Sequence, residues 1–318
     1  MRTSIHFGRA FHPRIAIVRL AVIMAVAVVT MALAPRTGFA QPATDIFLAD
    51  VSVRDGRLHV GTPVNVTQRD GYDNQPWFTP DGRAFLYVSE RDGQTDVFRF
   101  DIEARTSSRV TDTPWNEYSP SLSNDGTRMM VVRWPTDMST GALWWFTADG
   151  SPLEQATGSV PRVGYYTFVD QHTLALFIND SIQSFMLSDT RTGDTIRVGR
   201  NMGGSAPRTI PGQRAVSFLR QHDDGAWWLT RLDIDTRRTT PLVAMLEGAA
   251  NYAWTARGSV MAARDGTIHE WSPGSDWNEI AFFTEPALQG ITRIAISSAG
   301  DRIAFVSARP QPDEPRAH

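Results

Sequence analysis

The residues of this 318-residue chain best suited to chemistry are the carboxylates Asp73 and Glu117, because they occupy equivalent places in two copies of a repeated sequence. An amide stands beside each of them, Asn74 in the first copy and Asn116 in the second. Carboxylate and amide oxygens are the ligands that a hard cation such as Ca²⁺ prefers. The sequence therefore predicts a cation site at Asp73 and Glu117. The alternative is that both acids accept hydrogen bonds from neighbouring loop amides and only fix a strand.

Four further residues occupy the corresponding places in later copies of the repeat: Tyr165, Asn251, Tyr252 and Arg293. Tyrosine and arginine are common anchors at interfaces, so these positions suit stacking on a peptide or a sugar. The alternative is that these side chains only pack within their strands. Together with Asp73, Asn74, Asn116 and Glu117, they form the predicted ligand-binding set.

Groups for other kinds of catalysis are missing from the sequence. The chain has no cysteine, which excludes thiolate nucleophiles and disulfides. It has no Gly-x-Ser-x-Gly elbow, and His59, His172, His222, His269 and His318 show no metal-ligand spacing. No catalytic residue is predicted. Binding is favoured over catalysis, and the sequence leaves enzyme activity undecided.

The candidate side chains are positioned by a sequence repeat that runs along the chain. Its landmarks Gly82, Gly126, Gln171, Gly212, Gly258 and Gly300 are separated by 44, 45, 41, 46 and 42 residues. Each copy alternates short apolar runs with turn residues, and seven Asp-Gly pairs predict hairpin turns with both residues at positive φ. Several short strands in a repeat of this length are typical of β-propeller blades. The first residues of each inner strand would then meet at one mouth of a central channel.

The two ends of the chain are expected to build one blade together. The last copy, residues 291–307, supplies only two strands. Residues 45–50 and 61–67 resemble the third and fourth strands of the best copy, residues 96–101 and 107–111. Pairing of the N-terminal strands with the last blade would remove open sheet edges. The sequence thus predicts an all-β, six-bladed β-propeller over residues 41–308, followed by a flexible tail over residues 309–318.

The best copy resembles the WD-like repeat of TolB-type propellers, in the string Pro-Trp-Phe-Thr-Pro-Asp-Gly at 76–82 and in residues 85–98 after it. The resemblance covers nearly the whole chain after residue 40 and is specific in copies one, two and six. It implies an exported six-bladed propeller that closes through a split blade. TolB itself has an α/β domain ahead of its propeller, whereas here the strands begin soon after residue 41. We therefore expect a stand-alone propeller without that domain.

The first 40 residues are typical of a signal peptide. Arg2, Arg9, Arg14 and Arg19 precede the apolar run Leu20–Ala34, and Gly38 and Ala40 are small residues at the −3 and −1 positions of a cut before Gln41. The run is too short for a comfortable membrane span, although an uncleaved anchor is the alternative. The protein is therefore expected to be periplasmic or secreted, with no membrane span after cleavage. The leader holds five of the 31 basic residues and none of the 34 acidic ones, so the remaining chain has a net charge of −8, which argues against nucleic-acid binding.

These observations together predict an exported, non-enzymatic propeller scaffold. It would bind a protein, peptide or glycan partner in the cell envelope and would itself be a monomer. The alternative is a cation-dependent small-molecule hydrolase or lyase with its site at the central channel mouth, for which Asp73 and Glu117 would hold Ca²⁺.

Overall fold

The computed structural model describes residues 41–309, except residues 124, 136, 138, 158, 159 and 250. The predicted signal peptide and residues 310–318 of the predicted tail lie outside the described residues. Within the described part, regular structure is almost entirely β-strand, with one short 3-10 helix, η1 (Pro286–Leu288). None of the described residues forms a helix with the length and apolar character that a membrane crossing needs.

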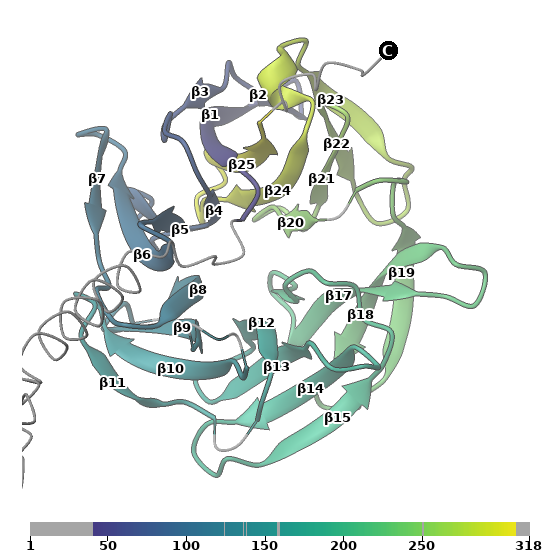
Figure 1. The fold of residues 1–318 in the computed structure, drawn as a ribbon. Coiled ribbons are helices and arrows are strands. Elements are labelled where there is room, and N and C mark those ends of the chain that lie inside the picture. Colours follow the sequence, from purple (N-terminus) through teal and green to yellow (C-terminus); the bar gives the residue numbers. More distant parts are fainter. Residues whose placement is uncertain are drawn as a thin grey trace, which may run out of the picture. The chain divides into compact units, whose positions relative to one another are not determined.

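The strands form six antiparallel sheets arranged as blades around a common centre (Figure 1), which confirms the predicted six-bladed propeller. Blade 1 contains β4 (Asp73–Phe78), β5 (Ala84–Arg91), β6 (Gln94–Asp101) and β7 (Thr106–Arg109). Blade 2 contains β8 (Asn116–Leu122), β9 (Arg128–Trp134), β10 (Ala142–Thr147) and β11 (Pro152–Gln155). Blade 3 contains β12 (Val163–Phe168), β13 (Thr173–Ile178), β14 (Ser184–Asp189) and β15 (Thr195–Gly199).

The remaining blades follow the same order from the centre outwards, except that the last one joins both ends of the chain. Blade 4 contains β16 (Arg208–Thr209), β17 (Ala215–Gln221), β18 (Trp227–Asp233) and β19 (Thr239–Ala244). Blade 5 contains β20 (Tyr252–Trp254), β21 (Val260–Arg264), β22 (Thr267–Trp271) and β23 (Asn278–Phe282). Blade 6 contains β24 (Ile291–Ile296), β25 (Arg302–Ala308), β1 (Thr44–Arg54) and β2 (Arg57–Val60), and β3 (Val64–Asn65) also pairs with β1.

Blade 6 closes the ring as the sequence predicts. β1 pairs antiparallel with β25 in an unbroken register that runs from Thr44 opposite Ala308 to Asp50 opposite Arg302. Arg309, which was assigned to the tail, donates hydrogen bonds of 2.8 Å to Asp45 and to Asp70. Arg309 therefore belongs to the propeller and not to the predicted tail.

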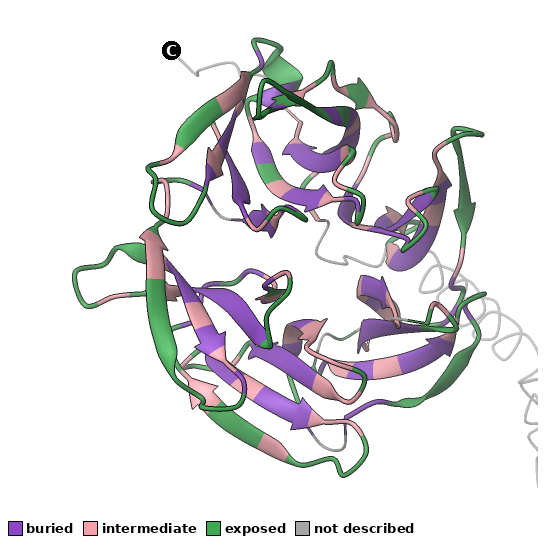
Figure 2. Ribbon diagram, turned by 180° about the vertical axis from the view of Figure 1, so that it is seen from behind, coloured by how far each residue is buried: buried purple, intermediate pink, exposed green. Residues whose placement is uncertain are grey.

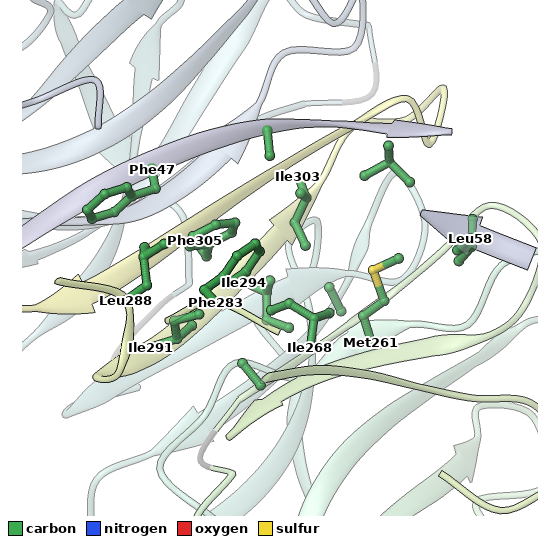
Figure 3. Packing of buried hydrophobic residues seen from close by; sticks show 14 residues of the cluster. Phe47, Leu58, Met261, Ile268, Phe283, Leu288, Ile291, Ile294, Ile303 and Phe305 are labelled. Carbon is green, nitrogen blue, oxygen red and sulfur yellow. The ribbon is translucent and has the colours of Figure 1, made fainter. Parts of the chain in front are cut away.

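The core lies between adjacent blades. One cluster combines Phe47 and Phe305 of blade 6, whose rings stack 6.0 Å apart, with Met261 and Ile268 of blade 5 (Figure 3). Burial is concentrated in the inner and middle strands, and the outer strands are largely exposed (Figure 2). This distribution follows from the alternation of the middle strands, whose two faces each meet a neighbouring blade.

The Asp-Gly turns differ from the prediction at most sites. Asp55, Asp92 and Asp265 do have positive φ, of 50°, 55° and 48°, together with their glycines. In the turn that ends the inner strand of blade 1, only Gly82 has positive φ, because Asp81 acts as a cap. The Asp81 Oδ1 atom accepts hydrogen bonds from the Thr79 hydroxyl at 2.5 Å and from the Arg83 amide at 3.1 Å.

Candidate functional site: the central channel

Two overlapping cavities lie where the six inner strands meet. The first, of about 180 Å³, is lined from blades 1, 2, 3, 4 and 6. The second, of about 390 Å³, is lined from all six blades. Both include Pro76, Trp77, Leu122, Thr167, Arg208 and Thr209 in their linings, so the two cavities form one channel site. A site of this size and position is where a propeller holds a small ligand or the end of a larger one.

Two backbone bulges turn the inner strands of blades 1 and 2 towards this site. Gln75 and Ser119 are equivalent residues with φ of 57° and 52°, and the strand register shifts at each of them. A bulge with a residue in this conformation re-aims the strand at the cost of some strain. The strain is offset locally, because the Gln75 side-chain oxygen accepts hydrogen bonds from the Ser119 amide and hydroxyl. Both residues line the first cavity.

Arg293 reaches across the channel from blade 6. Its Nε donates a hydrogen bond of 3.1 Å to the Asn74 Oδ1 of blade 1, and its Nη2 donates one of 3.0 Å to the Tyr165 hydroxyl of blade 3. The guanidinium also lies 5.2 Å from the centre of the Tyr165 ring. Tyr165 is itself held by stacking on Phe177 at 6.0 Å. Arg293 is therefore fixed in place by neutral partners.

Arg208 of blade 4 is the second cation at the site. It lines both cavities, and its Nε is buried without a hydrogen-bond partner. Burial, together with the positive charge of Arg293, lowers the pKa of Arg208 to about 10. The group stays protonated at neutral pH. None of the described residues that line the two cavities is acidic, so neither arginine has a carboxylate partner there.

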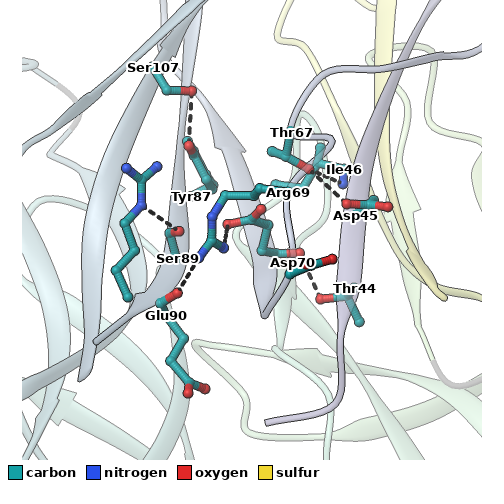
Figure 4. Close-up of polar contacts among 12 residues, drawn as sticks. Thr44, Asp45, Ile46, Thr67, Arg69, Asp70, Tyr87, Ser89, Glu90 and Ser107 are labelled. Carbon is teal, nitrogen blue, oxygen red and sulfur yellow. Dashed lines mark hydrogen bonds and ion pairs between the residues drawn. The ribbon is translucent and has the colours of Figure 1, made fainter. Parts of the chain in front are cut away.

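The predicted cation ligand Asp73 is engaged elsewhere. Its side chain is fully buried, and its Oδ1 accepts a hydrogen bond of 3.1 Å from Arg69. Arg69 also donates to the Glu90 carbonyl at 2.6 Å, which ties the loop before β4 to β5 (Figure 4). Burial raises the pKa of Asp73, while hydrogen bonding to Ser89 and the charge of Arg69 oppose that rise. Asp73 lines neither cavity.

Glu117, the second predicted ligand, is also occupied within its own blade. It accepts hydrogen bonds from the hydroxyls of Thr113 and Thr111 and lies 3.8 Å from the Nε of Arg133. Arg133 in turn lies 4.7 Å from the ring centres of both Trp115 and Trp144. Burial raises the pKa of Glu117 to about 7.

The alternative interpretation of these two acids, that they fix the strands, fits these contacts better than the cation site does. Among the described residues, no group of three or more His, Asp or Glu side chains is placed to hold a metal ion.

Of the eight predicted ligand-binding residues, the structure joins three, Asn74, Tyr165 and Arg293, and two of these line the first cavity. Asn116 accepts a hydrogen bond of 3.0 Å from the Thr95 amide. Tyr252 is fully buried, with its hydroxyl 2.9 Å from the Ser217 hydroxyl, and Asn251 is buried beside it in sequence. Asp73, Asn116, Glu117, Asn251 and Tyr252 line neither cavity.

The predicted ligand-binding set contains no residue of blade 4, and it therefore omits Arg208. The inner strand of this blade, β16, starts at Arg208 and is only two residues long. Arg208 lies two residues before the turn at Ile210, as Trp77 does before the turn at Thr79, so counting the leading positions of the repeat does not reach it. Trp77 and Trp254 are half-buried: each packs against a core cluster and also lines the second cavity.

Comparisons with known proteins support the assignment of the fold, but they do not assign a reaction or a ligand to this chain. No family model matches the sequence. A curated relative, the uncharacterized protein Atu1656 of Agrobacterium fabrum, is 27% identical over 78 residues. That match spans 24% of this chain and 27% of the relative, so the chain covers only about a quarter of the relative's length.

Solved structures show the same architecture. A putative TolB from Agrobacterium tumefaciens superposes with a TM-score of 0.65 at 16% identity, over 85% of this chain and all of the other. TolB from Acinetobacter baumannii gives 0.54 at 15% identity, over 92% of this chain and 71% of the other. An oligogalacturonate lyase from Vibrio parahaemolyticus gives 0.54 at 12% identity, over 79% and 82%. The fold is therefore that of the TolB-type six-bladed propellers, as the sequence predicts.

Proposed function

We propose that this protein is an exported scaffold that binds a protein, peptide or glycan partner in the cell envelope through its central channel, without catalysing a reaction. The observation that carries the proposal is the channel site itself. It combines the half-buried aromatic side chains of Trp77 and Trp254 with two arginines that have no carboxylate partner among the described residues. Aromatic and arginine side chains in a concave site are typical anchors for a partner.

The cellular location rests on two supports, the leader-like sequence at residues 1–40 and the likeness of the fold to TolB proteins. We infer that the protein acts in the periplasm or outside the cell. The partner is proposed to enter from the mouth lined by the inner strands, since residues of all six blades face it.

A channel-blocking variant tests the proposal. Thr209 is exposed and lines both cavities, so Thr209→Trp would fill the site without disturbing the core. The matched control is Thr240→Trp, on the exposed outer strand β19. Affinity capture from envelope extract is expected to retain a specific partner on the wild-type protein and on the control, but not on Thr209→Trp. Equal retention by all three proteins would overturn the channel as the binding site.

The alternative function, a cation-dependent hydrolase or lyase, is supported by the likeness of the fold to oligogalacturonate lyase. Folds of this kind host both binding proteins and enzymes, so that likeness does not choose between them. The contacts of Asp73 and Glu117 favour the scaffold, because both carboxylates already have partners within their own blades.

A further inference from the structure

Two guanidinium groups face one cavity, and the described residues around it supply no counter-charge. Arg208 and Arg293 both line the first cavity, and neither forms an ion pair with a described carboxylate. Elsewhere in the described chain, two partly buried arginines do have such partners: Arg69 lies 3.1 Å from Asp73, and Arg309 lies 2.8 Å from Asp45. Keeping two unneutralised cations in one partly buried site is costly unless an anion joins them.

We propose that Arg208 and Arg293 together bind a carboxylate group of a peptide ligand in the channel. This proposal rests on the proposed scaffold function and names the chemistry of its ligand. Arg293 is positioned for the task by Asn74 and Tyr165, which use its Nε and Nη2 atoms and leave Nη1 for a ligand. Arg208 donates no side-chain hydrogen bond to a described residue, so its Nη1 and Nη2 atoms are available to a ligand, while its Nε is buried and unpaired. A planar carboxylate matches such a pair of donors with two parallel hydrogen bonds.

The lining beyond the arginines favours a peptide over a sugar. The second cavity shares Arg208 with the first, and ten of its fifteen lining residues are apolar, among them Trp77, Trp254 and Ile296. None of the fifteen is an amide or an acid, the side chains that most often bind sugar hydroxyls. An acylated amino acid would fit both cavities at once. Its carboxylate would bind the two arginines, and its apolar side chain would lie in the second cavity. The ligand is therefore a peptide whose carboxylate lies next to an apolar residue.

A titration with a defined probe tests this assignment. The probe is N-acetyl-Ala-Leu with a free carboxylate, and its matched neutral form is the same dipeptide with a C-terminal amide. Isothermal titration calorimetry on the purified protein is expected to show binding of the acid and binding at least about tenfold weaker for the amide, as the loss of a charge-assisted contact implies. Arg208→Gln should weaken binding of the acid by a similar factor and leave the weak binding of the amide unchanged.

The control variant is Arg257→Gln, which makes the same change of net charge in the exposed turn after β20. It should bind the acid as the wild-type protein does. Thermal melting of both variants checks that each is folded. Equal affinity of acid and amide, or undiminished binding by folded Arg208→Gln, would overturn the proposal.

Two further probes separate the ligand classes. Glucuronate carries the same charged group on a sugar, and inorganic phosphate carries a different anion. Tighter binding of either one than of N-acetyl-Ala-Leu would overturn the peptide assignment. If no probe binds but Thr209→Trp still abolishes partner capture, the carboxylate proposal fails while the scaffold function stands.

Discussion

Glu117 illustrates at the residue scale how burial changes the role of a side chain that suits metal binding in the sequence. Its carboxyl lies among Thr111, Thr113 and Arg133 inside blade 2. Burial dominates over these favourable contacts and raises its pKa to about 7. A carboxyl that is partly protonated at neutral pH is a poor cation ligand but a sensitive reporter of local packing.

The pH dependence of stability should reveal this residue. Because the folded protein holds the Glu117 proton up to about pH 7, whereas the unfolded chain releases it near 4.5, the folded state binds more protons in this window. The free energy of unfolding should therefore fall as pH rises from about 4.5 to 7, by on the order of 3 kcal/mol for this group. In denaturant unfolding, Glu117→Gln should no longer show this decrease in the free energy of unfolding with pH. The variant Glu103→Gln, at an exposed position, should still show it. Parallel curves for both variants would contradict the raised pKa.

Occupied carboxylates should also make the protein insensitive to calcium. Asp73 is bound by Arg69, and Glu117 by its two threonines. We expect millimolar Ca²⁺ to leave the melting temperature of the wild-type protein unchanged. A rise in melting temperature that disappears in the Asp73→Asn, Glu117→Gln double variant would restore the cation site and, with it, the alternative function.

Unpaired Arg208 should contribute little to stability. Replacing it with methionine removes a charge that is repelled by Arg293 and has no carboxylate partner, so Arg208→Met should melt at the same temperature or higher. Arg109→Met provides the contrast, because it leaves the buried Asp96 without its 2.7 Å partner. That variant should lose about 1–3 kcal/mol, measured by thermal or denaturant unfolding. A comparable loss in Arg208→Met would mean that Arg208 has a structural role.

At the scale of elements, the sequence predicted the regular parts of the fold and missed the irregular ones. The likeness of residues 45–50 to residues 96–101 correctly placed β1 against β25, because strand patterning follows the period of side-chain alternation. The bulges at Gln75 and Ser119 and the two-residue strand β16 follow no such period. They decide which side chains enter the channel, so Arg293 and Tyr165 were identified while Arg208 was missed.

The closing strand pair should dominate stability among the elements. Phe47 of β1 is buried against Phe305 of β25, with the rings stacked 6.0 Å apart. Phe47→Ala should therefore lower the free energy of unfolding by about 3–5 kcal/mol. Phe282→Ala, at the end of outer strand β23 where the ring is 59% exposed, should change it by less than about 1 kcal/mol. Similar effects of the two substitutions would show that the ring does not depend on this closure.

For the whole molecule, closure of six blades produces a site that no single blade contains. Arg293 of blade 6 contacts Asn74 of blade 1 and Tyr165 of blade 3, residues separated by 219 and 128 positions in the sequence. The first contact joins neighbouring blades and the second crosses the ring, and together they fix one cation at the cavity. The proposed scaffold function depends on this arrangement, since the partner would meet side chains from every blade at once.

The most direct test of the channel as the binding site uses the absence of cysteine from the chain. A single thiol can be placed in the channel with Thr209→Cys, or on outer strand β19 with Thr240→Cys, and its rate of reaction with N-ethylmaleimide measured with and without the captured partner. The partner should slow modification at position 209 at least about tenfold and leave position 240 unchanged, since bound material excludes the reagent. An unchanged rate at position 209 with the partner bound would place the interaction elsewhere on the protein.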